Sequence, residues 1–177
     1  YVHNSYMHSR VFYLLQANGG NKTYTLTFTA TPVAGAASLI VMEFSYTGTC
    51  IRDAYTRANG NSASANSGNI DTTGADGLAI GFFSENDGSW YEYTSEQINS
   101  VAATEPSYSP ITDHMASVAY RILSASFTGG AATASCTSQI WAAHIIAFKA
   151  AAVTVSDIVL RVAEGPSISP SASVSPS

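Results

Sequence analysis

The sequence predicts an all-β protein, an antiparallel sandwich of jelly-roll type with an extended C-terminal strand and a Ser/Pro tail. Apolar and polar residues alternate with a period of two in several segments, which is typical of strands with one buried face. Many short segments of this kind are separated by glycine- and asparagine-rich turns, and none has a convincing helical pattern. A chain of 177 residues suits one ordinary domain. We expect an N-terminal extended segment at 1–10, the sandwich at 11–150, an extra strand at 151–165 and the tail at 166–177.

The sandwich is expected to begin with a hairpin. Residues 11–16, which are apolar up to residue 15, are predicted to form a strand, and the turn-forming sequence Asn18-Gly19-Gly20-Asn21 follows them. Threonines then alternate with larger side chains from Thr23 to Ala30, which predicts a strand with one wet face. Residues 38–46 are apolar at nearly every position, as expected of a central strand buried on both faces.

The middle of the chain is predicted to alternate short strands and loops. Residues 60–68 are small and polar, which favours a surface loop. Short strands are expected at 69–72 and 78–83, followed by a loop at 85–89. Residues 90–93 fit a strand or an aromatic loop, and residues 105–110 are expected to be irregular.

The last third of the sandwich is predicted to be strand, with helix as the alternative at two places. Residues 114–127 and 140–149 are long and partly alanine-rich, so a helix stays open at both. Gly129-Gly130 would turn the chain between 114–127 and a strand at 131–136. The apolar phase of residues 153–163 shifts at Asp157, which a β-bulge would produce.

The composition favours an extracellular or cell-surface protein. Charged residues make up 11% of the chain, against about 25% in an average soluble protein. The surface must therefore be rich in hydroxyl and amide groups, as in secreted β-rich proteins. The net charge of −5 and the lack of a basic cluster argue against nucleic acid as a partner. No apolar run approaches the roughly 20 residues that a membrane-spanning helix needs.

Two cysteines leave two interpretations open. Cys50 and Cys136 are far apart in the sequence and show no C-x-x-C spacing. In an oxidising compartment they could form a disulfide, worth on the order of 4 kcal/mol in the chain-entropy model. The alternative is two small buried thiols.

Motifs of known catalytic chemistry are missing from the sequence. It has no G-x-S-x-G, H-E-x-x-H or phosphate-binding glycine loop. The carboxylate pairs Glu85 with Asp87 and Glu92 with Glu96 read as solvated loop charges, and His144 reads as a packed or hydrogen-bonded histidine. We therefore predict no catalytic site, no metal site and no cofactor.

Aromatic side chains gather at one point of the sequence. Trp90, Tyr91 and Tyr93 could form a platform on which a sugar ring stacks. The alternative is that these rings pack into the sandwich or into a contact between subunits.

Two features predict covalent glycans. Asn21-Lys22-Thr23 matches the N-glycosylation pattern at an expected turn. The tail offers hydroxyls as O-glycan acceptors, and the alternative is a bare flexible linker. The tail acceptors alternate with apolar and proline residues and are Ser167, Ser169, Ser171, Ser173 and Ser175.

The order of several segments resembles lectin-like jelly-roll sandwiches of bacterial and phage surface proteins. The resemblance covers about residues 11–150 and implies a fold and an extracellular setting rather than an activity. The segments that carry it are Val11-Phe-Tyr-Leu-Leu, Gly19-Gly20 with Tyr24-Thr-Leu-Thr-Phe, Ile40-Val-Met-Glu-Phe-Ser-Tyr, Ser67-Gly-Asn-Ile-Asp-Thr-Thr with Leu78-Ala-Ile-Gly-Phe, and Trp141-Ala-Ala-His-Ile-Ile-Ala-Phe-Lys.

The chain departs from that group at its N-terminus, where only ten residues precede the first matching strand. A sandwich that lacks an edge strand exposes unpaired backbone groups, so a strand from another copy could complete it. The chain has a spare strand after the sandwich, and residues 1–7 are a second candidate. The apolar residues of the spare strand are Val153, Val155, Ile158, Leu160 and Val162.

The sequence thus predicts a structural subunit of an extracellular fibril or surface appendage, because donated strands join subunits head to tail. In this it resembles subunits of donor-strand fibrils. Its expected partners are copies of itself and covalent glycans. The alternative is a carbohydrate-binding module of a larger secreted protein.

Overall fold

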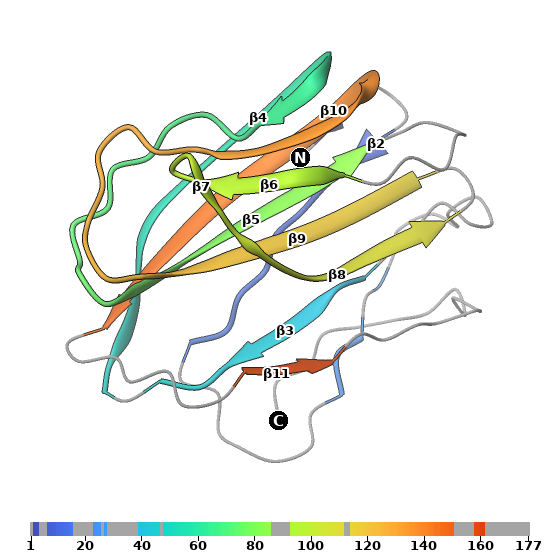
Figure 1. Ribbon diagram of the computed structural model, residues 1–177. Helices are drawn as coiled ribbons and strands as arrows, with labels where there is room; N and C mark the ends of the chain where they lie inside the picture. The colour runs from blue at the N-terminus through green and yellow to red at the C-terminus, as the bar shows by residue number, and fades with distance from the viewer. Residues whose placement is uncertain are drawn as a thin grey trace.

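The computed structural model describes residues 2–3, 7–15, 23–25, 27, 39–46, 48–85, 93–111, 114–150 and 158–161 (Figure 1). This part of the chain contains strands, turns and extended segments but no helix, and all of its strand pairs are antiparallel. The predicted all-β, antiparallel class is therefore confirmed. The tail at 166–177 lies outside the described residues.

Seven strands form one sheet, and four short strands form two smaller ones. The order in the large sheet is β7-β6-β10-β5-β9-β8, with β4 paired to the free side of β10. The small sheets are β1-β2 and β3-β11. The strands are β1 Val2–His3, β2 Met7–His8, β3 Val41–Phe44, β4 Cys50–Asn66, β5 Gly77–Glu85, β6 Thr94–Ile98, β7 Val101–Ala102, β8 Thr104–Ile111, β9 His114–Leu123, β10 Ala132–Ala150 and β11 Ile158–Arg161.

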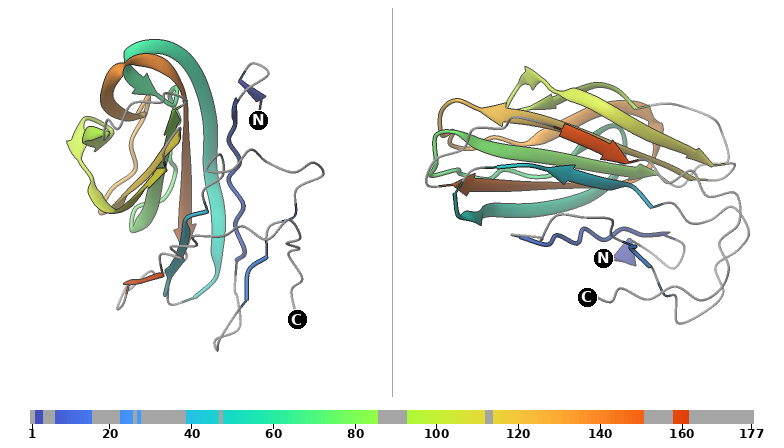
Figure 2. Two further views of the ribbon diagram at one scale, coloured as in Figure 1. Left: turned by 90° about the vertical axis from the view of Figure 1, so that its right-hand side faces the viewer. Right: turned by 90° about the horizontal axis from the view of Figure 1, so that it is seen from below.

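The longest strand, β10, carries the sheet around a corner. Its first residues pair with β6, where Ala132 lies opposite Ile98, and its second half pairs with β5 from Trp141 to Lys149. β4 accompanies both halves, with register shifts between Ser135 and Gln139 and beside Ala147. Such irregularities bend a strand. The large sheet therefore curls back on itself until it is nearly closed (Figure 2).

Small residues let β4 lie close to an indole ring. A Cβ atom on Gly60 would meet Cζ2 of Trp141 at 2.5 Å, so only glycine fits there. The Trp141 Nε1–H group donates a hydrogen bond to Ser62 Oγ at 3.0 Å. The prediction of a surface loop at 60–68 is therefore wrong for residues 60–66, because their small side chains serve close packing in a strand.

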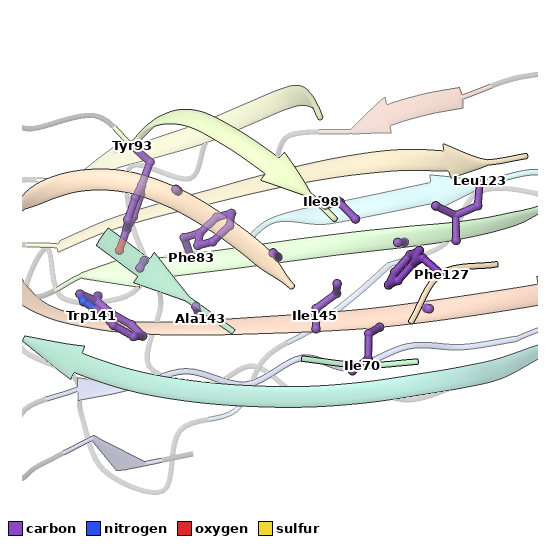
Figure 3. Packing of buried hydrophobic residues seen from close by; sticks show 14 of the residues in the cluster. Ile70, Phe83, Tyr93, Ile98, Leu123, Phe127, Trp141, Ala143 and Ile145 are labelled. Carbon is purple, nitrogen blue, oxygen red and sulfur yellow. The ribbon is translucent and has the colours of Figure 1, made fainter. Parts of the chain in front are cut away.

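Apolar side chains cover both faces of the central strands. Along β10, Ile145 points into the space inside the curled sheet, and Ile146 points to the outer face. Both residues are almost completely buried, which explains the continuous apolar run in this strand. Figure 3 shows the inner cluster. Its larger members are Ile70, Phe83, Tyr93, Ile98, Met115, Leu123, Phe127, Trp141 and Ile145.

Other expected elements are confirmed in part. The strands expected at 78–83, 114–127, 131–136 and 140–149 correspond to β5, β9 and the single strand β10, so the helical alternative is wrong at both places. Residues 105–110 lie in β8 rather than in an irregular segment.

Two expected strands, at 11–16 and 69–72, are not seen among the described residues, and the turn of the N-terminal hairpin lies outside them. Residues 11–15, 23–25 and 27 belong to no strand, and the remaining residues of 16–30 lie outside the described part. Residues 69–72 contain one isolated bridge, between Ile70 and Gly130.

Candidate functional site

The outer face of the large sheet is apolar and needs a cover. Ile80, Val118, Ile146 and Phe148 form a second buried cluster on this face. Burying such a surface is the main favourable term in folding. The cover comes partly from segments outside the large sheet, among them residues 11–15 and β3 with the residue before it (Figure 2).

Aromatic edges fix this cover to the sheet. Phe44 of β3 meets Tyr120 of β9 edge-to-face, with ring centroids 5.5 Å apart. Tyr13 meets Phe148 in the same way at 5.4 Å. Edge-to-face pairs are favourable because the positive edge of one ring meets the negative face of the other.

β3 presents one face to this cluster and the other to solvent. Met42 and Phe44 pack on the outer face of the sheet, whereas Glu43 is exposed. Among the described residues, β3 forms a ladder only with β11. It is therefore half-buried in a two-stranded sheet, and the prediction of a central strand buried on both faces is wrong.

The spare strand is described in part. Ile158 lies opposite Phe44 and Leu160 lies opposite Met42 in the β3–β11 ladder of a single chain. The other predicted donor residues, Val153, Val155 and Val162, lie outside the described residues. The N-terminal candidate contains the short β1–β2 pair, in which His3 lies opposite Met7.

The two cysteines lie on different strands and far apart: Cys50 is in β4, and Cys136 is in β10 beside the other end of β4. Both are free thiols; Cys50 begins β4, and Cys136 Sγ lies 3.5 Å from the carbonyl oxygen of Ser62. The stretch of β4 from Cys50 to Ser62 spans roughly 40 Å at the usual rise of a strand. A disulfide needs Cα atoms within about 7 Å, so a bond between these cysteines within one chain does not fit the fold. Burial raises the pKa of both thiols.

The aromatic platform is not formed as predicted, because Tyr93 is buried. Its side chain is 1% exposed, and its ring lies 5.4 Å from that of Phe83 in the inner cluster (Figure 3). Burial first, and then the charge of Glu85, raise the pKa of Tyr93 well above its usual value. Trp90 and Tyr91 lie outside the described residues, as do the glycosylation candidates Asn21, Ser167, Ser169, Ser171, Ser173 and Ser175.

Two glutamates expected in solvated loops lie inside the fold. Glu85 ends β5 with 1% exposure and accepts a hydrogen bond from Gln139 Nε2. Glu96 of β6 is buried, and its carboxylate lies 3.3 Å from the hydroxyl of Ser117. The same hydroxyl lies 3.0 Å from Glu105 on β8. These hydrogen bonds link β6, β8 and β9 of the large sheet, which the sequence pattern of isolated acids does not reveal.

Asp53, near the start of β4, forms an ion pair with Lys149 and hydrogen bonds to the loop before β5. Asp53 accepts hydrogen bonds from the backbone N–H and the hydroxyl of Thr73, both at 2.7 Å, and lies 3.2 Å from Lys149 Nζ. Burial raises the pKa of Asp53, but these hydrogen bonds outweigh it and lower that pKa overall. The described residues bring together no group of three or more His, Cys, Asp or Glu side chains able to hold a metal.

A shallow hollow of about 210 Å³ lies where the N-terminal segment crosses β4 and β10. Its lining is mainly polar. The hydroxyl of Tyr55 lies 3.0 Å from His144 Nδ1, which holds both side chains in place. Burial and the nearby charge of Arg57 lower the pKa of His144 to about 4, so the imidazole is neutral at pH 7. The lining residues are Ser9, Arg10, Val11, Phe12, Tyr55, Arg57 and His144.

Sequence reasoning identified His144 as a packed histidine but did not identify the hollow. Tyr55 and Arg57 are two positions apart on β4, so their side chains leave the same face. This spacing, which places an aromatic and a basic side chain side by side, can be found in the sequence alone. The hollow is completed by residues 9–12, which are far from β4 and β10 in the sequence, and no local sequence pattern predicts that they meet these strands.

Comparison of the chain with protein-family models, with curated proteins and with solved structures gives no match in any of the three. The resemblance to lectin-like sandwiches of surface proteins therefore stays a prediction. Among the described residues, no helix has the length and apolar character needed to cross a membrane.

Proposed function

We propose that the chain is a non-enzymatic structural subunit of an extracellular fibril, assembled head to tail by donation of the strand that contains β11. The observation that carries this proposal is the β3–β11 ladder. β11 follows β10 in the sequence, and within the described residues it pairs with β3 alone. Its partner β3 covers part of the apolar outer face of the large sheet.

The same ladder can form within one chain or between two copies. Four residue pairs, from Ile158 with Phe44 to Arg161 with Val41, join the two strands. A copy that receives β11 from a neighbour makes the same backbone hydrogen bonds, so exchange leaves the number of these bonds unchanged. Residues 151–157 connect β10 to β11, and seven extended residues span at most about 25 Å, which sets the reach of a donated strand.

A β3 strand without a paired β11 would favour binding of a β11 strand from another copy. Without β11, the β3 edge would present unpaired N–H and C=O groups beside an apolar layer, which is the kind of edge to which an extended strand adds. Each subunit would then give one strand and receive one. This contact is heterologous, and it builds an open filament when its rotation does not close.

The composition supports the extracellular part of the proposal. The chain has few charged residues, and its tail alternates serine with apolar and proline residues. In the proposed fibril the sandwich, of jelly-roll type, forms the body, and the tail and Asn21 carry glycans on the surface.

Mixed crosslinking tests the proposal directly. Glu43 of β3 lies opposite Val159 of β11 in the ladder, and Glu43 is exposed. Two variants, Glu43→Cys and Val159→Cys, are made in a background in which Cys50 and Cys136 are both replaced by alanine. We expect oxidation of the mixed subunits to give covalent dimers that contain one copy of each variant. Each single variant oxidised alone is the matched control, because it lacks the opposing thiol.

The opposite result is equally clear. A chain that carries both new cysteines could crosslink only within itself and remain a monomer under denaturing conditions, while the mixed single variants give no mixed dimer. That outcome would place β11 on its own body and reject strand donation.

The alternative function is a carbohydrate-binding module of a larger secreted protein. Because Tyr93 is buried in the inner cluster, the predicted aromatic platform does not favour it. The hollow beside β4 and β10 does favour it, because its lining includes two arginines and two exposed aromatic side chains.

A further inference from the structure

Basic side chains meet at the hollow although the chain is acidic overall. The protein has seven lysines and arginines and a net charge of −5, yet Arg10 and Arg57 line the same hollow. Both side chains are exposed, so their charge acts at the surface. Two guanidinium groups around one concave site create a local positive potential that attracts an anion.

Hydroxyl groups add neutral hydrogen-bonding capacity to the same site. Ser9 and Tyr55 belong to the lining, and the Tyr55 hydroxyl lies 3.0 Å from His144 Nδ1. In the tautomer with a proton on Nδ1, the imidazole donates to the phenol oxygen, and the phenol proton is directed to a ligand. The hollow thus combines planar cationic donors with neutral hydroxyl donors.

Two exposed aromatic side chains belong to the otherwise mainly polar lining. Phe12 is 71% exposed and Tyr55 is 38% exposed, and both belong to the lining. Exposed aromatic rings beside hydrogen-bond donors suit a ligand that has one flat apolar face and a polar edge. A volume of about 210 Å³ lies below the range of about 300–1,000 Å³ of sites for drug-sized ligands, which favours a ligand of about one ring.

We propose that this hollow binds a uronic acid unit of an acidic polysaccharide. Its carboxylate would lie between Arg10 and Arg57, because guanidinium groups bind carboxylates through paired, charge-assisted hydrogen bonds. Its sugar ring would lie against the exposed surface of Phe12 and Tyr55. The Ser9 and Tyr55 hydroxyls would bind the hydroxyls of the sugar.

This site is separate from the proposed joint between subunits. None of its lining residues belongs to β3 or β11, so binding by a single subunit needs no assembly. In a fibril the hollow would recur once per subunit, and weak single sites would bind a long polysaccharide through multivalency.

Titration of the full chain with D-glucuronate tests the proposal, with binding followed by NMR or calorimetry. We expect saturable binding at millimolar concentrations, with binding of D-glucose and of inorganic sulfate each at least about tenfold weaker. The double variant Arg10→Gln/Arg57→Gln should lose at least about tenfold in glucuronate affinity. Arg52→Gln is the matched control, because Arg52 is an exposed arginine of β4 outside the lining; its affinity should change less than about twofold.

Three outcomes would overturn the proposal. The wild-type chain could show no saturable binding of glucuronate at these concentrations. The double variant, confirmed as folded by circular dichroism, could bind glucuronate as well as the wild type does. Sulfate could bind as tightly as glucuronate, which would show a general anion site to which the sugar ring contributes nothing. None of these results bears on strand donation, which the crosslinking of β3 to β11 tests separately.

Discussion

Single side chains show how this fold places polar groups against apolar surroundings. His144 is 1% exposed, and its Nδ1 lies 3.0 Å from the Tyr55 hydroxyl on the neighbouring strand. Arg57 lies directly opposite His144 in the β4–β10 register, and Arg10 lines the same hollow. The imidazole is therefore buried and close to the positive charge of Arg57, and both favour its neutral form.

This environment predicts that the free energy of unfolding falls in mild acid. The pKa of His144 is about 4 in the folded chain and about 6.5 when it is unfolded, so the unfolded chain binds the proton more readily. The stabilisation is fully present above pH 6.5, is lost as the pH falls towards 4, and amounts to at most about 3 kcal/mol.

Urea unfolding at several pH values measures this effect. Carboxylates also titrate in this range, so the wild type is compared with His144→Gln, which has no titrating ring. The difference in unfolding free energy between the two should shrink as the pH falls from 6.5 to 4. A constant difference across that range would show that His144 does not titrate as argued.

At the scale of elements, the sequence predicts strands well where both faces are apolar. The second half of β10 and most of β5 have alternate residues in the inner and outer clusters, so their apolar runs report real burial. β9, which was predicted from its β-favouring composition, likewise has the successive residues Val118 and Ala119 buried on opposite faces. Tertiary packing on two sides excludes the helix that alanine content alone would permit.

The sequence fails where burial depends on distant partners. The small residues 60–66 read as a loop, but Trp141 on β10 makes them a strand by packing against Gly60. The alternating threonines from Thr23 read as a strand, yet the described residues there pair with no other strand. The hollow was not predicted for the same reason: it brings residues 9–12 together with β4 and β10, which are distant in the sequence.

The packing of β3 predicts unequal effects of neighbouring substitutions. Phe44→Ala removes a half-buried ring that contacts Tyr120 and covers the outer cluster, so it should lower the free energy of unfolding by about 1–3 kcal/mol. Glu43→Ala, at the exposed position next to it, should change stability by less than about 0.5 kcal/mol.

Chemical denaturation and binding of an apolar dye test this pair of variants. Dye fluorescence should rise only for Phe44→Ala, because the outer cluster then loses part of its cover. Equal stability of both variants would mean that β3 does not protect the sheet. The packing role of β3 would then have to be rejected, and with it the reason that β3 needs a partner strand.

For the whole molecule, the two apolar clusters differ in what completes them. The described members of the inner cluster all belong to the part of the sequence that runs from β4 to β10. They lie on strands of the large sheet or on the loops that join these strands. The outer cluster also depends on β3 and residues 11–15, which precede that sheet in sequence and lie beside it in space (Figure 2). The large sheet therefore supplies its inner cluster by itself. In the proposed exchange, the donated strand would pair with β3, which covers part of the outer cluster.

This difference predicts the effect of deleting residues 153–177. The inner cluster stays intact in the shortened chain, so the body should fold, but β3 loses its only partner among the described residues and stability should fall by a few kcal/mol. Polymers, followed by electron microscopy and sedimentation, should no longer form. A deletion of residues 166–177 alone is the matched control, because it keeps β11 and should still assemble. Undiminished assembly of the shorter chain would reject C-terminal donation and direct attention to residues 1–7, whereas a failure of both deletions would assign the joint to the tail rather than to β11.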